Sequence, residues 1–250
     1  LTRKAEMLDE IVLSASKGVE KRSRIAEQVA ITSREEIKKI APQTSADLLA
    51  NLPGVRVQKS QFGGGSPVLR GMEANRVLLV VDGVRMNNAI YRSGNLQNII
   101  SFDPLALQDA EVIFGPGSLM YGSDAIGGVM DFHTLEPKLA ANNKTIVLGD
   151  ALVRYASANN EKTGHANLNI AGKKLSFLTS FTTSNFGDFK MGKHGGQDNY
   201  LRKEYIERIN NKDVVVQNTN PYLQKNTGYH QNNLLTKLRY KPSDHWDLQY

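Results

Sequence analysis

The chain has 250 residues, of which 40% are hydrophobic and 22% charged, and its formal net charge is +6. It has no cysteine, which excludes disulfides and cysteine-ligated zinc sites. The basic residues are dispersed rather than gathered in a stripe, so we expect no nucleic-acid partner. No run approaches the roughly 18 consecutive apolar residues of a membrane helix, so any membrane role must be non-helical.

Residues 1–18 are polar around one apolar run, LDEIVLSA at residues 8–15. This pattern predicts a mobile N-terminal arm that carries one short strand. The chain begins at Leu1 without a basic and apolar signal segment, so we expect any export signal to have been removed.

Residues 19–137 predict a small domain of strands, short helices and many loops. A strand is expected at VAIT, and Ser33 followed by Glu36 has the spacing of a capping box for a helix of about two turns. Thr44 or Ser45 would cap a second short helix. Further strands are expected at VRVQ, PVLRG, RVLLVV, AEVIF and VMDF.

Residues 115–132, GPGSLMYGSDAIGGVMDF, combine five glycines with apolar residues that favour burial. No G-x-x-x-x-G-K-[ST] or G-x-G-x-x-G motif follows a strand, so a phosphate-binding loop is not expected. Glycine permits close backbone approach and positive φ. The segment is therefore interpreted as a turn-rich part of a packed domain.

Residues 138–250 show dyad alternation typical of long strands. In LSFLTSF, Phe177 and Phe181 share one face while Ser176 and Ser180 share the other. Short turns at 172–174 and 241–244 alternate with one long polar connection at 187–227, a pattern that suits a transmembrane β-barrel. Aromatic residues flank the 241–244 turn, as at a membrane interface: Tyr240, Trp246 and Tyr250. A β-sandwich shares the alternation, and periodicity alone leaves both open.

Catalytic patterns are absent from the sequence. The five histidines, which include His133 and His194, form neither H-x-x-x-H nor H-E-x-x-H, and no serine has a G-x-S-x-G context. The acidic residues make no recognisable acid/base pair: Asp103, Asp109, Glu111 and Asp124. We therefore expect no enzyme, no catalytic or metal-ligating residue, and no intrinsic cofactor.

Three segments carry a family likeness in their order and spacing: DLLANLPGVRVQ, PVLRGMEANRVLLVVDGVRMNN and DPLALQDAEVIFGPGSLMYGSDAIGGVMDF. Together they resemble the plug domain of TonB-dependent outer-membrane receptors, densely over residues 45–133. The resemblance implies an arm at 1–18, an α+β plug domain with a small mixed sheet and short helices at 19–137, and about five antiparallel strands of a transmembrane β-barrel at 138–250. Five strands cannot close the family's 22-stranded barrel, so the barrel is expected to be incomplete in this chain, the N-terminal part of a longer receptor.

The resemblance also implies three sets of site residues. The arm resembles a TonB box, the strand offered to TonB, at Asp9, Glu10, Ile11, Val12, Leu13 and Ser14. The alternative is a terminal strand of the plug sheet. Substrate would meet two apical plug loops through Gln61, Phe62, Asn87, Asn88, Tyr91 and Arg92, although each of these could instead only pack its loop.

An ion-pair network between plug and barrel is the third implied site. Its candidate members here are Arg70 and Glu111, although Phe114 stands where the family commonly has arginine. The alternative for Arg70 is a surface side chain with a solvated partner.

The resemblance implies TonB-dependent uptake of a scarce nutrient in the outer membrane of a Gram-negative cell, with the plug facing the periplasm and barrel lumen. The implied partners are TonB with its inner-membrane energising complex, outer-membrane lipid, and a small-molecule metal chelate. A ferric siderophore or haem is favoured over cobalamin, and His194 or His133 could ligate haem. The alternative is a soluble β-rich binding or adhesion module with no transport role.

Overall fold

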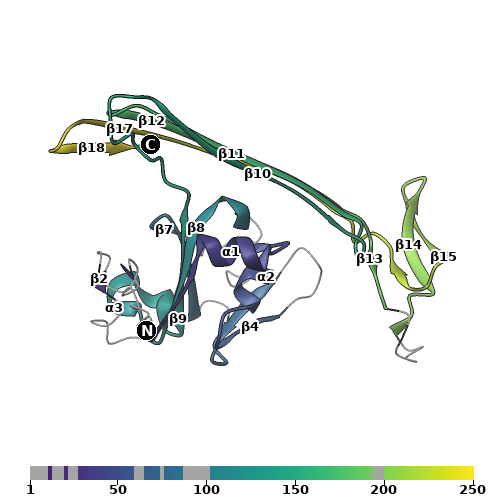
Figure 1. Cartoon of the computed structure of the whole chain (residues 1–250). Coiled ribbons are helices and arrows are strands. Elements are labelled where there is room, and N and C mark those ends of the chain that lie inside the picture. The colour runs from purple at the N-terminus through teal and green to yellow at the C-terminus, as the bar shows by residue number, and fades with distance from the viewer. Residues whose placement is uncertain are drawn as a thin grey trace, which may run out of the picture. The chain divides into compact units, whose positions relative to one another are not determined.

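The computed structural model describes residues 11–12, 20–21, 28–58, 65–73, 76–86, 102–192, 194 and 200–250. The chain divides into two compact units, a first unit at Leu1–Glu136 and a second unit at Pro137–Tyr250. Among the described residues, no helix is long and apolar enough to cross a membrane. Figure 1 shows short helices in the first unit and long strands in the second.

The first unit is built on a five-stranded mixed sheet. Only the pairing of β6 with β9 is parallel, and its other neighbouring strands are antiparallel. In spatial order the strands are β3 (Gln28–Ser33), β8 (Leu107–Phe114), β9 (Gly128–Thr134), β6 (Val77–Val81) and β7 (Val84–Arg85). The small mixed sheet inferred from the sequence is therefore confirmed.

Two short helices follow β3, and each begins with a capping box. Helix α1 (Arg34–Ile40) has Ser33 as its N-cap, paired reciprocally with Glu36 as the sequence predicts. Helix α2 (Ser45–Ala50) has Thr44 as its N-cap, which settles the choice between Thr44 and Ser45. In each box the cap side chain and the third helical residue satisfy backbone N–H groups that the helix itself leaves unpaired.

The smaller elements of the first unit surround this framework. Two small two-stranded sheets are present: β1 (Ile11–Val12) pairs with β2 (Glu20–Lys21), and β4 (Val55–Gln58) pairs with β5 (Ser66–Leu69). The remaining pieces are single turns of helix: η5 (Pro104–Ala106), α3 (Ser118–Tyr121) and η6 (Ser123–Ala125).

Both faces of the five-stranded sheet are covered by apolar side chains. On one face, Ile37 of α1 and Leu48 of α2 pack in a cluster with Val112 and Phe114 of β8. On the other, Ile113 of β8 belongs to a second cluster, together with Val29, Leu78, Tyr121 and Val129. Successive residues of a strand point to opposite faces, so β8 contributes to both cores.

The glycine-rich segment lies within this packing. At Gly128 φ is +150°, and a Cβ there would lie 2.5 Å from the carbonyl oxygen of Ile113. At Gly117 a Cβ would lie 2.8 Å from a methyl group of Val129. Glycine thus lets the backbone approach its neighbours closely while Tyr121, Val129 and Phe132 of the same segment are buried.

The second unit is a five-stranded antiparallel sheet with neighbours in spatial order β10, β11, β12, β17 and β18. Its strands are β10 (Ile146–Ala156), β11 (Glu161–Ala171), β12 (Leu175–Phe186), β17 (Tyr229–Ser243) and β18 (Trp246–Gln249). Each of the five strands expected from the dyad pattern is present.

The connection between β12 and β17 differs from the single polar loop expected for it. It contains a hairpin of β14 (Glu204–Ile209) and β15 (Lys212–Gln217), and β13 (Phe189–Lys190) pairs with β16 (Leu223–Gln224). The hairpin turns at Asn210 and Asn211, both with positive φ. Two consecutive residues with positive φ fit a type I′ turn, for which asparagine is well suited.

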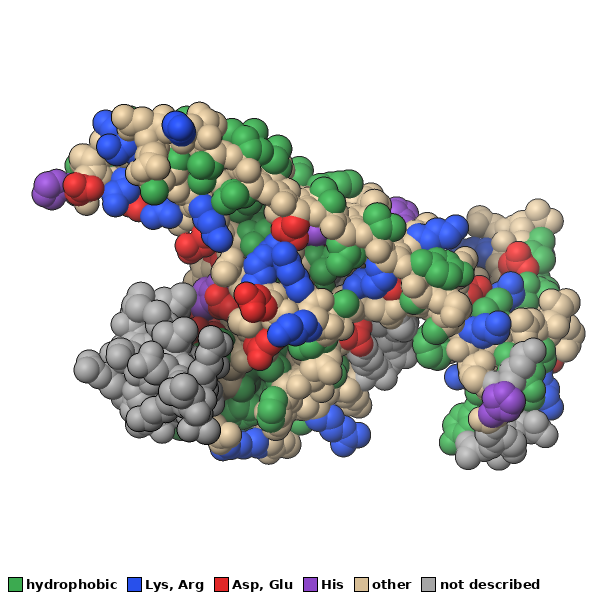
Figure 2. All heavy atoms as spheres, viewed as in Figure 1, with side chains coloured by type: hydrophobic (Ala, Val, Ile, Leu, Met, Phe, Trp, Pro, Cys, Tyr) green, Lys and Arg blue, Asp and Glu red, His purple; other side chains and the backbone are tan. Residues whose placement is uncertain are grey.

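In the second unit, the five-stranded sheet exposes its apolar face and buries its polar face, the reverse of a sheet in a soluble protein. Phe177 and Phe181 of β12 are 40% and 48% exposed, whereas Ser176 and Ser180 on the opposite face are 0% and 2% exposed. The exposed apolar set continues across the neighbouring strands through Val153, Leu168, Ile170, Leu234, Leu238, Trp246 and Leu248. Figure 2 shows hydrophobic side chains at the surface along these strands.

This inversion decides between the two architectures that periodicity left open. A β-sandwich buries its apolar faces, whereas the strands of a transmembrane barrel turn apolar side chains to lipid and polar ones inward. The aromatic residues near the β17–β18 turn are exposed as well: Tyr240, Trp246 and Tyr250. The second unit therefore has the pattern of antiparallel transmembrane strands, and the described residues form no closed barrel.

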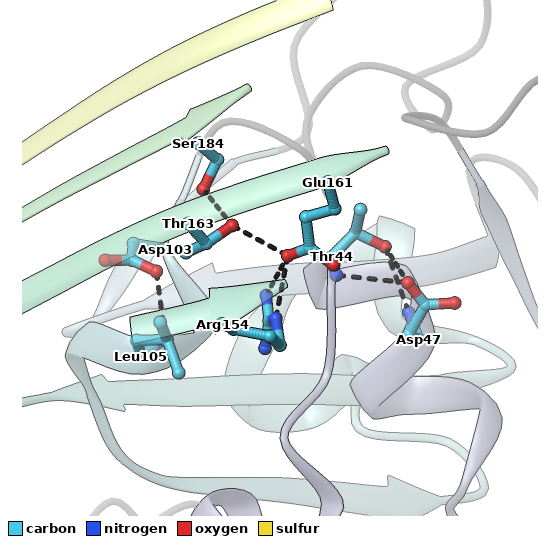
Figure 3. Close-up of polar contacts among 8 residues, drawn as sticks. All are labelled: Thr44, Asp47, Asp103, Leu105, Arg154, Glu161, Thr163 and Ser184. Carbon is cyan, nitrogen blue, oxygen red and sulfur yellow. Dashed lines mark hydrogen bonds and ion pairs between the residues drawn. The ribbon is translucent and has the colours of Figure 1, made fainter. Parts of the chain in front are cut away.

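One network of polar side chains on the buried face links three strands. Arg154 of β10 lies 2.7 Å from Glu161 of β11, which is fully buried, and Thr163 donates to Glu161 at 2.7 Å. The Thr163 hydroxyl also lies 3.1 Å from that of Ser184 on β12 (Figure 3). Burying a charge is unfavourable unless it is paired and hydrogen-bonded, and this network supplies both. Figure 3 also shows the Thr44–Asp47 capping box of the first unit.

Candidate functional site

The residues expected to touch substrate lie outside the part of the chain that the structure describes. They are Gln61, Phe62, Asn87, Asn88, Tyr91 and Arg92. Their role stays a prediction. The stems next to them are described: β4 and β5 flank the first loop, and β7 precedes the second.

Two residues of the expected TonB-binding segment are described, Ile11 and Val12, which form β1. They pair antiparallel with Lys21 and Glu20 of β2, in a two-stranded sheet that is separate from the five-stranded sheet of the first unit. Asp9, Glu10, Leu13 and Ser14 lie outside the described residues. Ile11 and Val12 therefore have strand geometry without belonging to the main sheet.

Arg70 directly follows β5 and is held against the end of β8. Its φ is 48°, a left-handed conformation that is uncommon for a residue with a Cβ. The guanidinium lies over the ring of Phe114, 5.0 Å from the ring centroid, and donates to Gln28 Oε1. Phe114 thus contacts Arg70, one of the two candidates for the implied ion-pair network.

Glu111 points to the opposite face of the sheet from Phe114. Phe114 and Val112 belong to the cluster beside α1 and α2, whereas the odd-numbered Ile113 belongs to the second cluster. Alternation along β8 places Glu111 with Ile113. The structure therefore does not bring Arg70 and Glu111 together within the first unit.

Four ionisable side chains instead meet on this face: Asp109 and Glu111 from β8, and Asp131 and His133 from β9. The register pairs Asp109 with His133 and Glu111 with Asp131. We call these four residues the acid–histidine cluster. The spacing of the acidic residues alone does not reveal these neighbours of Asp109 and Glu111, because they come from a strand some twenty residues further along.

A register shift in β8 positions Asp109. The pairing of β8 with β9 shifts between Leu107 and Asp109, which leaves Gln108 as an extra residue. Leu107 and Ala110 both belong to the core beside the helices, so the shift keeps Leu107 buried there while Asp109 joins the cluster. Bulges of this kind re-aim side chains and are enriched near functional sites.

His133 lies between two carboxylates. Its Nδ1 is 2.5 Å from Asp109 Oδ1, and its Nε2 is 3.8 Å from Asp131 Oδ1. Asp131 accepts a hydrogen bond from the Tyr121 hydroxyl at Oδ2, at 3.1 Å, while its buried Oδ1 has no hydrogen-bond partner. Glu111 and Asp131 are only 2% and 4% exposed.

Burial and charge shift the pKa values in this cluster. Burial lowers the pKa of His133, but the hydrogen bond and charge of Asp109, with the charges of Asp131 and Glu111, outweigh it and raise the pKa to about 9. Burial raises the pKa of Asp131 against the opposing effects of His133 and Tyr121. Burial, together with Asp131, also raises the pKa of Tyr121. At neutral pH His133 is therefore a cation among acidic groups.

The other histidine considered for haem, His194, is an exposed residue of the β12–β17 connection. A signal for the cluster was present in the sequence: D-A-E and D-F-H are i, i+2 pairs of ionisable residues inside otherwise apolar strands. Such pairs place both side chains on one face of a strand.

Comparison with known proteins finds a family model and relatives that match part of this chain. A family model described as TonB-dependent Receptor Plug Domain matches residues 21–129. A vitamin B12 transporter, BtuB, of Vibrio vulnificus strain YJ016 is 36% identical over 130 residues, which cover 51% of this chain and 21% of that protein. The BtuB of strain CMCP6 is 34% identical over 131 residues, 50% of this chain and 20% of that protein. The chain thus matches about a fifth of the length of these relatives.

Solved structures show the same fold across both units. A pyoverdine outer-membrane receptor, FpvA of Pseudomonas aeruginosa PAO1, matches with a TM-score of 0.68 at 12% identity, over 96% of this chain and 29% of that one. The copper transporter OprC matches with a TM-score of 0.62 at 18% identity, over 86% of this chain and 28% of that one. The family match and the common fold agree: residues 21–129 match the plug domain of TonB-dependent receptors, and antiparallel strands follow this domain in the chain.

Proposed function

We propose that this chain is the N-terminal part of an outer-membrane receptor that imports a scarce nutrient with energy supplied through TonB. The proposal rests on the opposite burial patterns of the two units in one chain. A plug domain with an apolar core precedes strands whose apolar face is exposed and whose polar face is buried. This is the composition expected of a barrel in lipid that is closed by a folded domain.

The transport cycle follows from these parts. Polar inner faces of the strands line an aqueous lumen, and the plug prevents leakage through it. Substrate bound outside must therefore wait until the plug rearranges. The N-terminal arm gives TonB a strand to pair with, in which main-chain hydrogen bonds transmit the pull. The proposed strand comprises Asp9, Glu10, Ile11, Val12, Leu13 and Ser14.

The proposed substrate is a metal chelate. Gln61, Phe62, Asn87, Asn88, Tyr91 and Arg92 would supply an aromatic face, amides and one cation, which suit a polar or anionic chelate. A ferric siderophore or haem is the first candidate. Cobalamin is the second, because the two Vibrio relatives are named as vitamin B12 transporters. The chain itself performs no covalent chemistry and needs no cofactor of its own.

The proposed partners match the surfaces of the chain. TonB, with its inner-membrane energising complex, would meet the arm on the periplasmic side, and outer-membrane lipid would meet the apolar face of the second unit. Arg70 and Glu111 would act separately in holding the plug. Arg70 is engaged with Phe114 and Gln28, and Glu111 lies on the far face of the sheet.

The test is uptake by the intact receptor in a strain that lacks its own transporters for the three ligands. We expect one of ferric siderophore, haem or cobalamin to accumulate in cells only when TonB is present. Val12→Pro removes a backbone N–H from the pairing strand, so it should reduce uptake at least tenfold while surface binding of the ligand is unchanged. Val12→Ala keeps that N–H and is the matched control.

Two outcomes would count against the proposal. Uptake by Val12→Pro equal to that of Val12→Ala would reject the assignment of the TonB-binding strand. Recovery of the intact protein in the soluble fraction without detergent would reject the receptor itself and favour the soluble β-rich module.

A further inference from the structure

The acid–histidine cluster of the first unit brings three carboxylates and one histidine together on one face of the sheet. Glu111 and Asp131 are direct cross-strand partners, and both are almost completely buried. Like charges placed directly opposite on neighbouring strands are destabilising, and burial in low dielectric strengthens the repulsion. Asp109 adds a third carboxylate on the same face. One histidine is the only cationic side chain among these four residues.

A polar atom in this cluster is left without a hydrogen bond. Oδ1 of Asp131 is buried and unpartnered, although Oδ2 accepts from Tyr121. Nε2 of His133 lies 3.8 Å from this oxygen, which is too long for a hydrogen bond. Buried polar atoms are nearly always satisfied in folded proteins, so an exception of this kind points to a missing partner or to a rearrangement that supplies one.

The remaining donor atoms already converge. One ligand atom from each of Asp109, Glu111 and His133 lies within 4.8 Å of the other two. A single imidazole with two carboxylates is a donor set that zinc and related first-row divalent ions accept. Hard ions such as Mg²⁺ are served by oxygen alone and gain little from the imidazole.

We propose that the acid–histidine cluster is a binding site for one divalent transition-metal ion, ligated by Asp109, Glu111 and Nδ1 of His133. Nε2–H of His133 then donates to Oδ1 of Asp131, which satisfies that oxygen and fixes the ring. A carboxylate that orients a metal-bound histidine is a common arrangement in metal sites.

A metal ion can reach the site from solvent, and the Asp109 side chain can move to accommodate it. Glu111 and Asp131 form its closed end, while the side chains of Asp109 and His133 are 22% and 19% exposed. Ligand distances of about 2.0–2.2 Å to zinc require the two coordinating atoms, now 2.5 Å apart, to separate to about 3 Å. The partly exposed Asp109 side chain can make that shift by rotation.

All proposed metal ligands lie within the first unit. Metal binding can therefore be measured whether or not any nutrient is imported. Isothermal titration of the intact purified receptor with Zn²⁺ is the test, with Mg²⁺ as the hard-ion comparison. We expect one tight Zn²⁺ site in the unaltered protein and no comparable Mg²⁺ site.

Variants assign that site to the cluster. Asp109→Asn and His133→Gln each remove one ligand with little change in volume, and each should weaken Zn²⁺ binding at least tenfold. Asp124→Asn removes a partly exposed carboxylate of the same unit that pairs with Arg85, and it should leave binding within about twofold of the unaltered protein. Equal Zn²⁺ binding by Asp109→Asn, His133→Gln and Asp124→Asn would overturn the proposal.

A second measurement needs no variant. Crystals of the unaltered receptor soaked in Zn²⁺ should give an anomalous peak among Asp109, Glu111 and His133. Zinc peaks only elsewhere in the protein, under conditions in which titration shows binding, would overturn the proposal equally.

Discussion

The two units of this chain place the same apolar residue types differently: the first unit buries them, and the second exposes them on its five-stranded sheet. In the first unit, leucine, valine and phenylalanine fill two cores on either side of a mixed sheet. In the second, phenylalanine and leucine are exposed along a sheet whose buried face carries serine, threonine, asparagine and histidine. Burial of apolar surface is favourable only when the alternative is water. The contrast therefore separates a unit with apolar cores from a sheet with the face pattern of transmembrane strands.

The largest expected loss of stability in the first unit comes from replacing Gly128, whose missing Cβ would lie closest to the backbone. Gly128→Ala would place a Cβ 2.5 Å from a backbone oxygen and 2.7 Å from a methyl group of Leu69, at a φ of +150°. The backbone cannot move aside as a flexible side chain can. Strain in this region of φ costs about 1–3 kcal/mol and overpacking about 1–3 kcal/mol more. We expect a loss of up to about 5 kcal/mol, measured by urea-dependent proteolysis of the first unit in the intact protein.

Gly115→Ala is the matched control for this glycine. Gly115 also has positive φ, +113°, but nothing lies within 4 Å of its missing Cβ. It should therefore suffer the backbone strain alone. Equal losses for the two variants would show that close backbone approach is not what glycine provides at Gly128.

The next effect tests the exposed apolar face of the second unit. Phe177→Arg puts a charge in the middle of the apolar set on β12, and Asn185→Arg puts one on the same face of the same strand, beyond Phe181. Arginine on the lipid face costs about 2–4 kcal/mol near the bilayer midplane and about 0–1 kcal/mol near an interface. Unfolding from lipid vesicles in urea should show this difference. If both variants lost the same stability, the exposed face would not be a membrane band.

Much of this contrast could be predicted from the sequence, because it depends on local patterns. The capping boxes at Ser33 and Thr44 are fixed by residues three positions apart, and the dyad pattern around Phe177 gives the strand and its two faces. Which face is buried was not predictable, since a soluble sandwich and a membrane barrel share the alternation. The hairpin of β14 and β15 was missed because its residues are largely exposed on both faces, so no hydrophobic period marks it.

The acid–histidine cluster could not be predicted for a different reason. Its members are adjacent only through the register of β8 with β9, and that register includes a shift at Gln108. A one-residue change of register moves every side chain of a strand to the other face. Without the shift, Asp109 and Leu107 would share one face, and either the core would lose a leucine or the cluster would lose an acid.

The smallest effect concerns the contact of Arg70 with Phe114 in the first unit. The guanidinium lies 5.0 Å from the ring centroid, and Phe114 is buried beneath it while Arg70 is exposed. A cation over an aromatic ring at an exposed site contributes about 0.5–1 kcal/mol. Arg70→Met keeps much of the stem and removes the charge, and Phe114→Leu keeps the core apolar and removes the ring.

A double-mutant cycle separates this contact from the packing that each variant disturbs. We expect the two substitutions to couple by about 0.5–1 kcal/mol in the unfolding free energy of the first unit. Because Arg70 also donates to Gln28, Arg70→Met alone should cost more than the coupling energy. Purely additive losses would mean that Phe114 only fills the core beside Gly54, and that the positive φ of Arg70 is set by the turn after β5 rather than by the ring.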